Sequence, residues 1–164
     1  MQYMRLDPSE REEFLAALSG MPSYLTAAFA NLSPDQARRA GPNGEPSPVE
    51  QVWHLADLER EGFAVRIQRL LSEREPSLPD FDGTRIAAER DYRSRSFQDG
   101  LAAFAEARQH NVAVFRRLQP ASWYANGTQE GVGAVSLCDI PGFMSQHDAA
   151  HRHEIDAWQQ SMGR

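Results

Sequence analysis

One short pattern occurs three times in the first fifty residues, and each time it is typical of the start of a helix. A Ser or Asp is followed by Pro, then by any residue, then by Glu or Gln, as in Asp7-Pro8-Ser9-Glu10, Ser33-Pro34-Asp35-Gln36 and Ser47-Pro48-Val49-Glu50. The first side chain can accept a hydrogen bond from a free backbone amide, and the Glu or Gln can reach back to the cap. Pro lacks an N–H at a position that needs none. The sequence therefore predicts a helical protein.

Apolar residues recur at helical spacing after these starts and predict four long helices. The expected ranges are about 8–31, with a kink at Gly20 and Pro22, then 48–72 and 97–118, and a last helix that begins between 136 and 143 and ends near 160. If Ser136 caps the last helix, Pro141 breaks a backbone bond one turn in, whereas Pro141 is harmless if Asp139 is the cap, which we favour. Little sheet is expected, and 133–137 is the best strand candidate.

The connection between the second and third expected helices is long, about 24 residues from Glu73 to Ser96. Such a length is unusual between antiparallel neighbours, and it suffices to travel back along a bundle, so the second and third helices can run parallel. The chain length suits one domain, and no linker divides it. We therefore expect an all-α four-helix bundle that forms a single domain over residues 1–164.

The charge balance limits the classes of partner. All 17 basic residues are Arg, and with 23 acidic residues the formal net charge is −6. The lack of Lys excludes a Schiff-base mechanism, and the acidic balance argues against a broad nucleic-acid surface. The single Cys138 can form no intrachain disulfide, no apolar run approaches the roughly 18–20 residues of a membrane span, and the start of the chain is acidic rather than basic. We expect a cytoplasmic protein that binds neither nucleic acid nor membrane.

Three of the five His residues predict a metal site. His147 and His151 lie four residues apart, so both imidazoles project from one face of a helix. That pair alone is also compatible with two polar residues satisfied by backbone carbonyls or water. His54, in the apolar stripe of the second helix, would complete a three-His site with an open coordination position, as in catalytic zinc centres. The face of the last helix that carries the pair should point inward, because it also carries Phe143, Ile155 and Trp158.

Two acidic residues are candidates for supporting these imidazoles or for acting as general bases. Glu50 lies four residues before His54 and could accept its second ring N–H, as a metal-bound His usually requires. The simpler role for Glu50 is to close the capping box of Ser47. Glu154 lies three residues after His151, and it is expected either beside the ligands or at the surface.

Other polar residues are expected to have no part in the site. Asp57 is interpreted as a solvated helix charge, and His153 should be exposed because it lies about 200° around the helix from His151. His110 is not expected to be a ligand, and Cys138 has no basic neighbour in the sequence that would make it a nucleophile. A solvated basic stretch is expected in the long connection, formed by Arg85, Arg90, Arg93 and Arg95.

Two stretches of the chain resemble motifs of the DinB/YfiT-like superfamily. Residues 47–59, SPVEQVWHLADLE, resemble its second-helix motif, and residues 147–155, HDAAHRHEI, resemble its last-helix motif His-x-x-x-His-x-x-Gln-Ile. The similarity runs over nearly the whole chain and includes LPDFD at 78–82 and AERDY at 88–92. One departure is that Glu154 stands where the family typically has Gln. This departure affects any family hydrogen bond that needs an amide donor at that position.

The resemblance implies an up-down-down-up bundle and a metal site of three His, which match His54, His147 and His151 here. It also implies nickel or zinc as the ion and a homodimer as a common assembly. Characterised relatives include enzymes that use low-molecular-weight thiols, so the reaction implied is a thiol-dependent S-transfer to a small-molecule substrate. The alternatives are a metal-dependent hydrolase, in which metal-activated water attacks, and a non-catalytic metal- or ligand-binding module.

Overall fold

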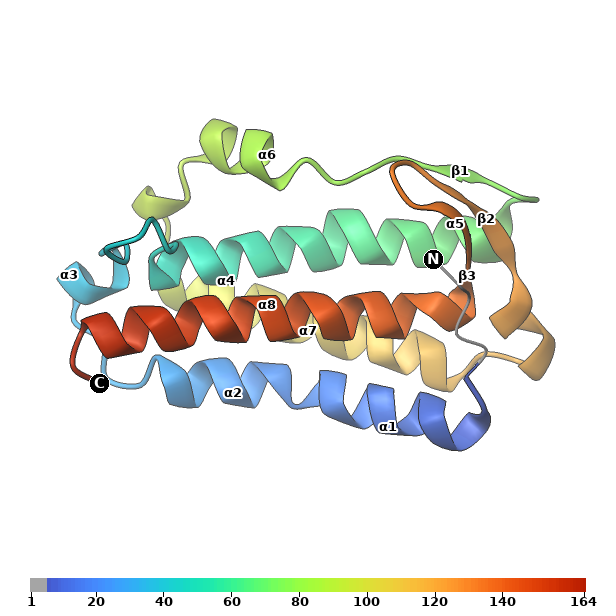
Figure 1. The fold of residues 1–164 in the computed structure, drawn as a ribbon, viewed down its shortest axis with the longest axis horizontal. Coiled ribbons are helices and arrows are strands. Elements are labelled where there is room, and N and C mark those ends of the chain that lie inside the picture. Colours follow the sequence, from blue (N-terminus) through green and yellow to red (C-terminus); the bar gives the residue numbers. More distant parts are fainter. Residues whose placement is uncertain (1–5) are drawn as a thin grey trace.

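The computed structural model describes residues 6–164, and its long helices lie side by side in an elongated bundle (Figure 1). The first rod of the bundle is made of α1 (Pro8–Ser19) and α2 (Met21–Ala28), which meet at Gly20 as expected. The second is made of α4 (Pro48–Asp57), a π-helical turn (Leu58–Phe63) and α5 (Ala64–Ser72). The third is α7 (Phe97–Arg116) and the fourth is α8 (Ile140–Ser161). The predicted all-α four-helix bundle is confirmed.

The long connection returns the chain along the outside of the bundle (Figure 1). It contains β1 (Ser77–Leu78), the short helix α6 (Gly83–Arg90) and a 3-10 turn (Tyr92–Ser94). Because of this return, α4 and α7 start at the same end of the bundle and run in the same direction, while α1 and α8 run the other way. The topology is up-down-down-up, as the resemblance implied. Within residues 6–164, no helix has both the length and the apolar character that crossing a membrane requires.

The three expected helix starts all carry the predicted reciprocal cap. Asp7, Ser33 and Ser47 each accept a hydrogen bond from the backbone three residues on and receive the Glu or Gln side chain in return, at the starts of α1, α3 (Pro34–Ala37) and α4. The last helix starts at Ile140, so Pro141 lies in its first turn and breaks no bond. Asp139 occupies the cap position without a capping side-chain bond, and instead closes a capping box with Ser136 around a 3-10 turn, Leu137–Asp139.

The π-helical turn in the second rod has a tertiary cause that periodicity does not show. The N–H of Ala64 donates to the carbonyl of Glu59, five residues back, which adds one residue to the turn. Asn111 of α7 donates to the same carbonyl at 3.2 Å and to Glu59 Oε2 at 2.8 Å. A side chain from another helix thus fixes the altered register, and such turns frequently lie at functional sites.

A small sheet closes the end of the bundle where α5 ends and α8 begins (Figure 1). Its strands are β1, β2 (Asn126–Gln129) and β3 (Gly133–Ser136), in the order β1-β2-β3. β1 pairs parallel with β2, and β2 pairs antiparallel with β3, so Gln129 lies opposite both Leu78 and Gly133. The strand expected over 133–137 is confirmed within one residue.

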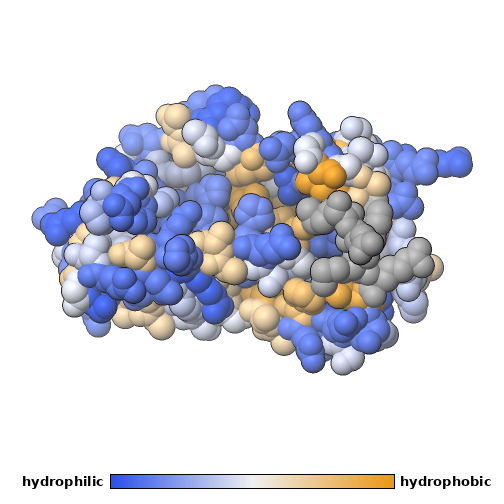
Figure 2. Space-filling model, viewed as in Figure 1, coloured by the Kyte–Doolittle hydropathy of each residue, from blue (hydrophilic) through white to orange (hydrophobic). Residues whose placement is uncertain are grey.

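The apolar core consists of two clusters, and a buried group of charges lies at their junction. Phe104 belongs to one cluster and Val112 to the other, and Arg108 lies one helical turn from each on α7. The five N–H groups of Arg108 donate to Glu59, to Asp148 and to the carbonyl of Leu18. These partners come from the other three rods, so one guanidinium ties all four together. On the face seen in Figure 2, apolar side chains gather away from the end that holds the C-terminus.

Candidate metal centre

The structure brings His54 of α4 and His151 of α8 together near the middle of the bundle. Their ring centroids are 5.0 Å apart. His54 is half-buried and His151 is only 8% exposed. The two residues are 97 positions apart in the sequence, and they meet because the second and fourth rods pack against each other.

His147 lies one turn before His151 on α8, and its ring is exposed. Its centroid is 6.4 Å from that of His151 and 5.6 Å from that of Phe63, whose ring it meets edge-on. The inward face expected for α8 was wrong by one residue over its first half, since Phe143 is only partly buried and His147 is exposed. The buried residues there are instead Met144 and Asp148. The physical reason is that Arg108 neutralises Asp148 inside the core.

The donor set fits an imidazole-binding ion, with one ring displaced. Zinc–nitrogen bonds of about 2.0–2.1 Å place the ring centres of two imidazoles on one tetrahedral ion about 5 Å apart. His54 and His151 meet this requirement, whereas His147 stands farther away. Accordingly, no three His, Cys, Asp or Glu side chains within residues 6–164 are already arranged around one point. Because His147 is exposed, its side chain can change rotamer without disturbing the core.

A polar chain orients the ring of His151. Its Nδ1 lies 2.9 Å from Oε1 of Gln51, and Nε2 of Gln51 donates to Glu154 Oε2 at 2.7 Å. Since an amide oxygen can only accept, Nδ1 is the nitrogen that carries the proton in the neutral ring, and Nε2 is the one that would bind a metal. Glu154 Oε2 is also 3.4 Å from Nδ1. The hydrogen bond with His151 holds the pKa of Glu154 below its ordinary value.

Gln51 was missed by the sequence analysis, although it lies three residues before His54 on the same helix. Its amide donates to Glu154, which as a carboxylate can only accept. The chain from His151 through Gln51 to Glu154 therefore joins α8 to α4 at the level of the imidazoles.

The long connection covers His54. The ring of Phe81 lies 6.2 Å from that of His54, centroid to centroid. A Cβ added to Gly83 would lie 2.8 Å from Cε1 of His54, so only glycine lets the chain pass this close. Burial, followed by the neighbouring His151, lowers the pKa of His54 to about 4. His54 is therefore neutral at pH 7, which is the state that ligates a metal.

The structure assigns Glu50 to the helix cap rather than to His54. Its Oε1 accepts from the backbone and hydroxyl of Ser47, at 3.1 and 2.7 Å, and from Arg93 at 3.1 Å. Within residues 6–164, no hydrogen bond joins Glu50 to His54. The capping interpretation is the one that the structure has.

Asp57 was wrongly expected to be solvated. Its carboxylate is buried, accepts from the hydroxyl of Tyr92 at 2.6 Å and pairs with Arg60 and Arg90, at 2.9 and 2.8 Å. Arg90 also pairs with Glu61, so the arginines of the connection are partly engaged in ion pairs with the second rod. Sequence spacing could not show this, because the partners meet only when the connection folds back over α4.

His153 is exposed, as expected. His110 is also exposed. Cys138 is 1% exposed, and burial raises the pKa of its thiol, so it is protected from solvent and poorly ionised.

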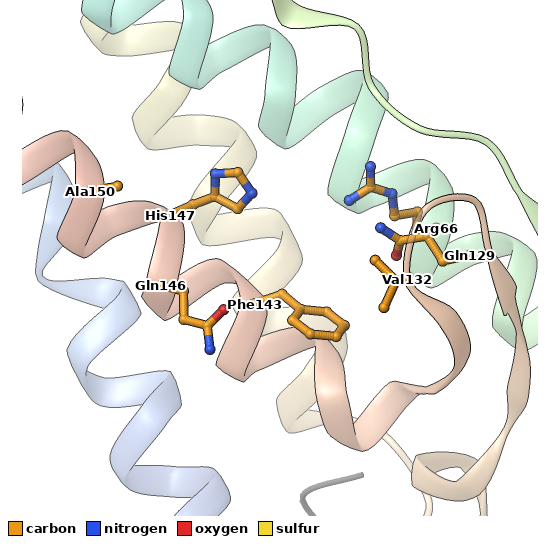
Figure 3. Close-up of a pocket in the computed structure, with 7 residues that line it drawn as sticks. All are labelled: Arg66, Gln129, Val132, Phe143, Gln146, His147 and Ala150. Atoms are coloured by element: carbon orange, nitrogen blue, oxygen red, sulfur yellow. The ribbon is translucent and has the colours of Figure 1, made fainter. Parts of the chain in front are cut away.

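A cavity of about 340 Å³ opens beside His147, between α5, the β2–β3 hairpin and α8 (Figure 3). Figure 3 shows the guanidinium of Arg66 and the amide of Gln129 on one side of it, facing His147 on the other. Phe143 and Val132 form its apolar wall. Neither Arg66 nor Gln129 could be predicted from the sequence, because these residues lie 63 positions apart and far from any motif.

Comparisons with known proteins bear on the whole chain. The model of the DinB superfamily matches residues 17–155. The structure is similar to that of YfiT from Bacillus subtilis, described as a probable metal-dependent hydrolase with an unusual four-helix bundle topology. The TM-score is 0.88 at 18% sequence identity, over 99% of this chain and 93% of that one, which shows a shared fold. A search of curated proteins found no match. From the extent of the family match, the chain belongs to the DinB superfamily.

Proposed function

We propose that the chain is a divalent-metal-dependent enzyme in which His54, His147 and His151 hold nickel or zinc. The observation that carries the proposal is the pairing of His54 and His151 at 5.0 Å, with Nδ1 of His151 occupied by Gln51. A metal-bound His almost always donates its second ring N–H to an acceptor, as Nδ1 of His151 does to Gln51. The description of YfiT as probably metal-dependent supports the same class of function.

Thiol-dependent S-transfer is the reaction that we place first. A bound divalent ion lowers the pKa of a coordinated thiol or water and so supplies a nucleophile near neutral pH. The chain's own thiol, Cys138, is buried, so the reacting thiol would belong to a small cosubstrate. Gln51 holds the proton of His151 at Nδ1, while Phe81 and Gly83 shield His54 from water. The cavity beside His147 offers room for the cosubstrate or the acceptor.

Hydrolysis is the second candidate, favoured by the description of YfiT as a probable hydrolase. A hydrolase needs a general base for water, and the two candidates from the sequence now differ. Glu50 accepts from Ser47 and Arg93 through Oε1, and Glu154 accepts from Gln51 through Oε2, so the role would fall to the other carboxylate oxygen of Glu154, Oε1. Small-molecule chemistry, a homodimer and a cytoplasmic location stay predictions.

Metal content after purification in chelator-free buffer tests the proposal. The wild type should retain a divalent ion, and His54→Ala, His147→Ala and His151→Ala should each lose most of it. His153→Ala is the matched control, because this ring is exposed on the same helix and should leave the metal content unchanged. Equal metal in the wild type and all four variants would refute the site.

The two reactions are separated by their need for a thiol. With 1-chloro-2,4-dinitrobenzene as acceptor, an S-transferase forms a carbon–sulfur bond, releases chloride and gives the thiol proton to solvent. With 4-nitrophenyl acetate and no thiol, a hydrolase releases nitrophenolate and acetate. Metal-dependent turnover of 1-chloro-2,4-dinitrobenzene alone supports S-transfer, and metal-dependent turnover of 4-nitrophenyl acetate alone supports hydrolysis. Turnover of neither compound supports a binding module.

A further inference from the structure

The cavity beside His147 contains two buried polar groups that lack hydrogen-bond partners. Arg66 and Gln129 are 5% and 7% exposed. Among the buried side-chain atoms of residues 6–164, Nε of Arg66 and Oε1 of Gln129 are the ones without a partner. Buried polar groups are nearly always satisfied, and leaving one unsatisfied costs free energy. That both belong to one cavity points to a ligand that supplies the missing partners.

Arg66 presents the edge of its guanidinium that suits a carboxylate. Nε is unpartnered, and Nη2 has only a long ion pair of 3.8 Å to Asp80, whose side chain is 70% exposed. These two nitrogens form the planar fork that receives both oxygens of a carboxylate. The guanidinium also lies 5.5 Å from the ring of Phe63, which limits its movement on the other side.

Gln129 is fixed by its backbone rather than by its side chain. Its position on β2 pairs with Leu78 on one side and Gly133 on the other. Its backbone therefore stays at the cavity wall, and a rotation of the side chain brings the buried Oε1 to an N–H or O–H group of a ligand. Val132 of the same hairpin and Phe143 of α8 provide an apolar surface for the carbon atoms of a ligand.

We propose that this cavity binds a small molecule through a carboxylate on Arg66 and an adjacent hydrogen-bond donor on Gln129. An acyl-amino acid end has this arrangement, with an amide N–H next to the carboxylate. The inference rests on the proposed function in that it assigns the substrate class of the same enzyme. It places the far end of the ligand toward His147.

Calorimetric titration with N-acetylglycine tests the proposal, and N-acetylglycinamide, which lacks the charge, is the matched probe. The full chain should bind the acid and not the amide, both as purified and after chelator treatment. Arg66→Met should weaken binding of the acid about tenfold or more, the effect of losing a charge-assisted pair. Arg116→Met, on an exposed arginine paired with Glu12, should leave it unchanged. Equal binding by the wild type and Arg66→Met would overturn the proposal.

Two further variants guard against a failure to fold. Gln129→Leu should weaken the binding of N-acetylglycine. Asp80→Asn should strengthen this binding a few-fold, because the Asp80 carboxylate that competes for Arg66 is removed. Arg66→Met should unfold at a temperature no lower than the wild type, since it removes an unsatisfied donor. A large loss of thermal stability would instead show that Arg66 serves the fold, and would count against the proposal.

Metal content measured on the same samples separates this inference from the proposed function. If the wild type contains no metal but binds N-acetylglycine, and Arg66→Met binds it more weakly, the metal centre is refuted and the carboxylate site is supported. If the wild type contains metal and binds N-acetylglycine as tightly as Arg66→Met does, the metal centre is supported and the carboxylate site is refuted. Titration with N-acetylcysteine then shows whether the ligand of the cavity is the thiol cosubstrate or the acceptor. Only a thiol cosubstrate should bind more tightly when metal is present.

Discussion

Replacing Arg108 with Met should cost about 4 kcal/mol of folding free energy, because it leaves two carboxylates buried without a counter-charge. The side chains of Arg108, Glu59 and Asp148 are 2%, 1% and 9% exposed. Removing one partner of a buried ion pair costs about 3–5 kcal/mol, and here five hydrogen bonds are lost at once. For a domain of this size, that corresponds to a fall of about 8–16 °C in the melting temperature.

Thermal and urea denaturation followed by circular dichroism measure this effect. Arg116→Met is the control, because its ion pair with Glu12 is exposed and should contribute less than about 1 kcal/mol. Adding Glu59→Gln and Asp148→Asn to Arg108→Met should recover part of the loss, since no buried charge then remains unpaired. A cost below about 1 kcal/mol for Arg108→Met would show that the charge cluster does not hold the four rods together.

Three other perturbations have defined outcomes. Gly83→Ala should displace the ring of His54 and weaken zinc binding, measured against a competing chelator, with little change in melting temperature. Gly142→Ala is the control, because a Cβ there has open space, and it should leave zinc binding unchanged. Gln51→Leu should reduce zinc affinity about 10–100-fold, and unchanged affinity would show that the amide does not orient the ligand. Burial alone would raise the pKa of Asp57, but hydrogen bonds from Tyr92, Arg60 and Arg90 bring it below its ordinary value. Its contribution is therefore present above the unfolded pKa of about 3.9 and lost as the pH falls through the lower folded value, so Asp57→Asn should flatten the loss of urea stability on acidification.

Local signals in the sequence were sufficient for the bundle. The caps at Asp7, Ser33 and Ser47 are formed by residues three positions apart, so each can be recognised without knowing the rest of the fold. The length of the connection was likewise enough to allow the parallel second and third rods. The four-residue spacing led to His147 and His151, and the apolar stripe of the second helix led to His54. The structure brings His54 and His151 together, whereas His147 stands farther from His151.

Features that depend on distant partners could not be predicted in the same way. Asp148 is buried because Arg108, 40 residues earlier in the sequence, neutralises it. A pattern of apolar residues does not reveal a buried charge, so the inner face of α8 was misplaced over its first half. The π-helical turn depends on Asn111 contacting Glu59 across the bundle. Arg66 and Gln129 become neighbours only when the hairpin closes over α5.

Because Cys138 is buried, the reactivity of its thiol reports on unfolding of the protein. A thiol-specific dye can reach this residue only when the fold opens, so the labelling rate reports the opening of the bundle near the start of α8. The same shielding means that free thiol measured during a reaction belongs to the added cosubstrate. Consumption of that thiol can therefore be followed directly, without correction for the enzyme.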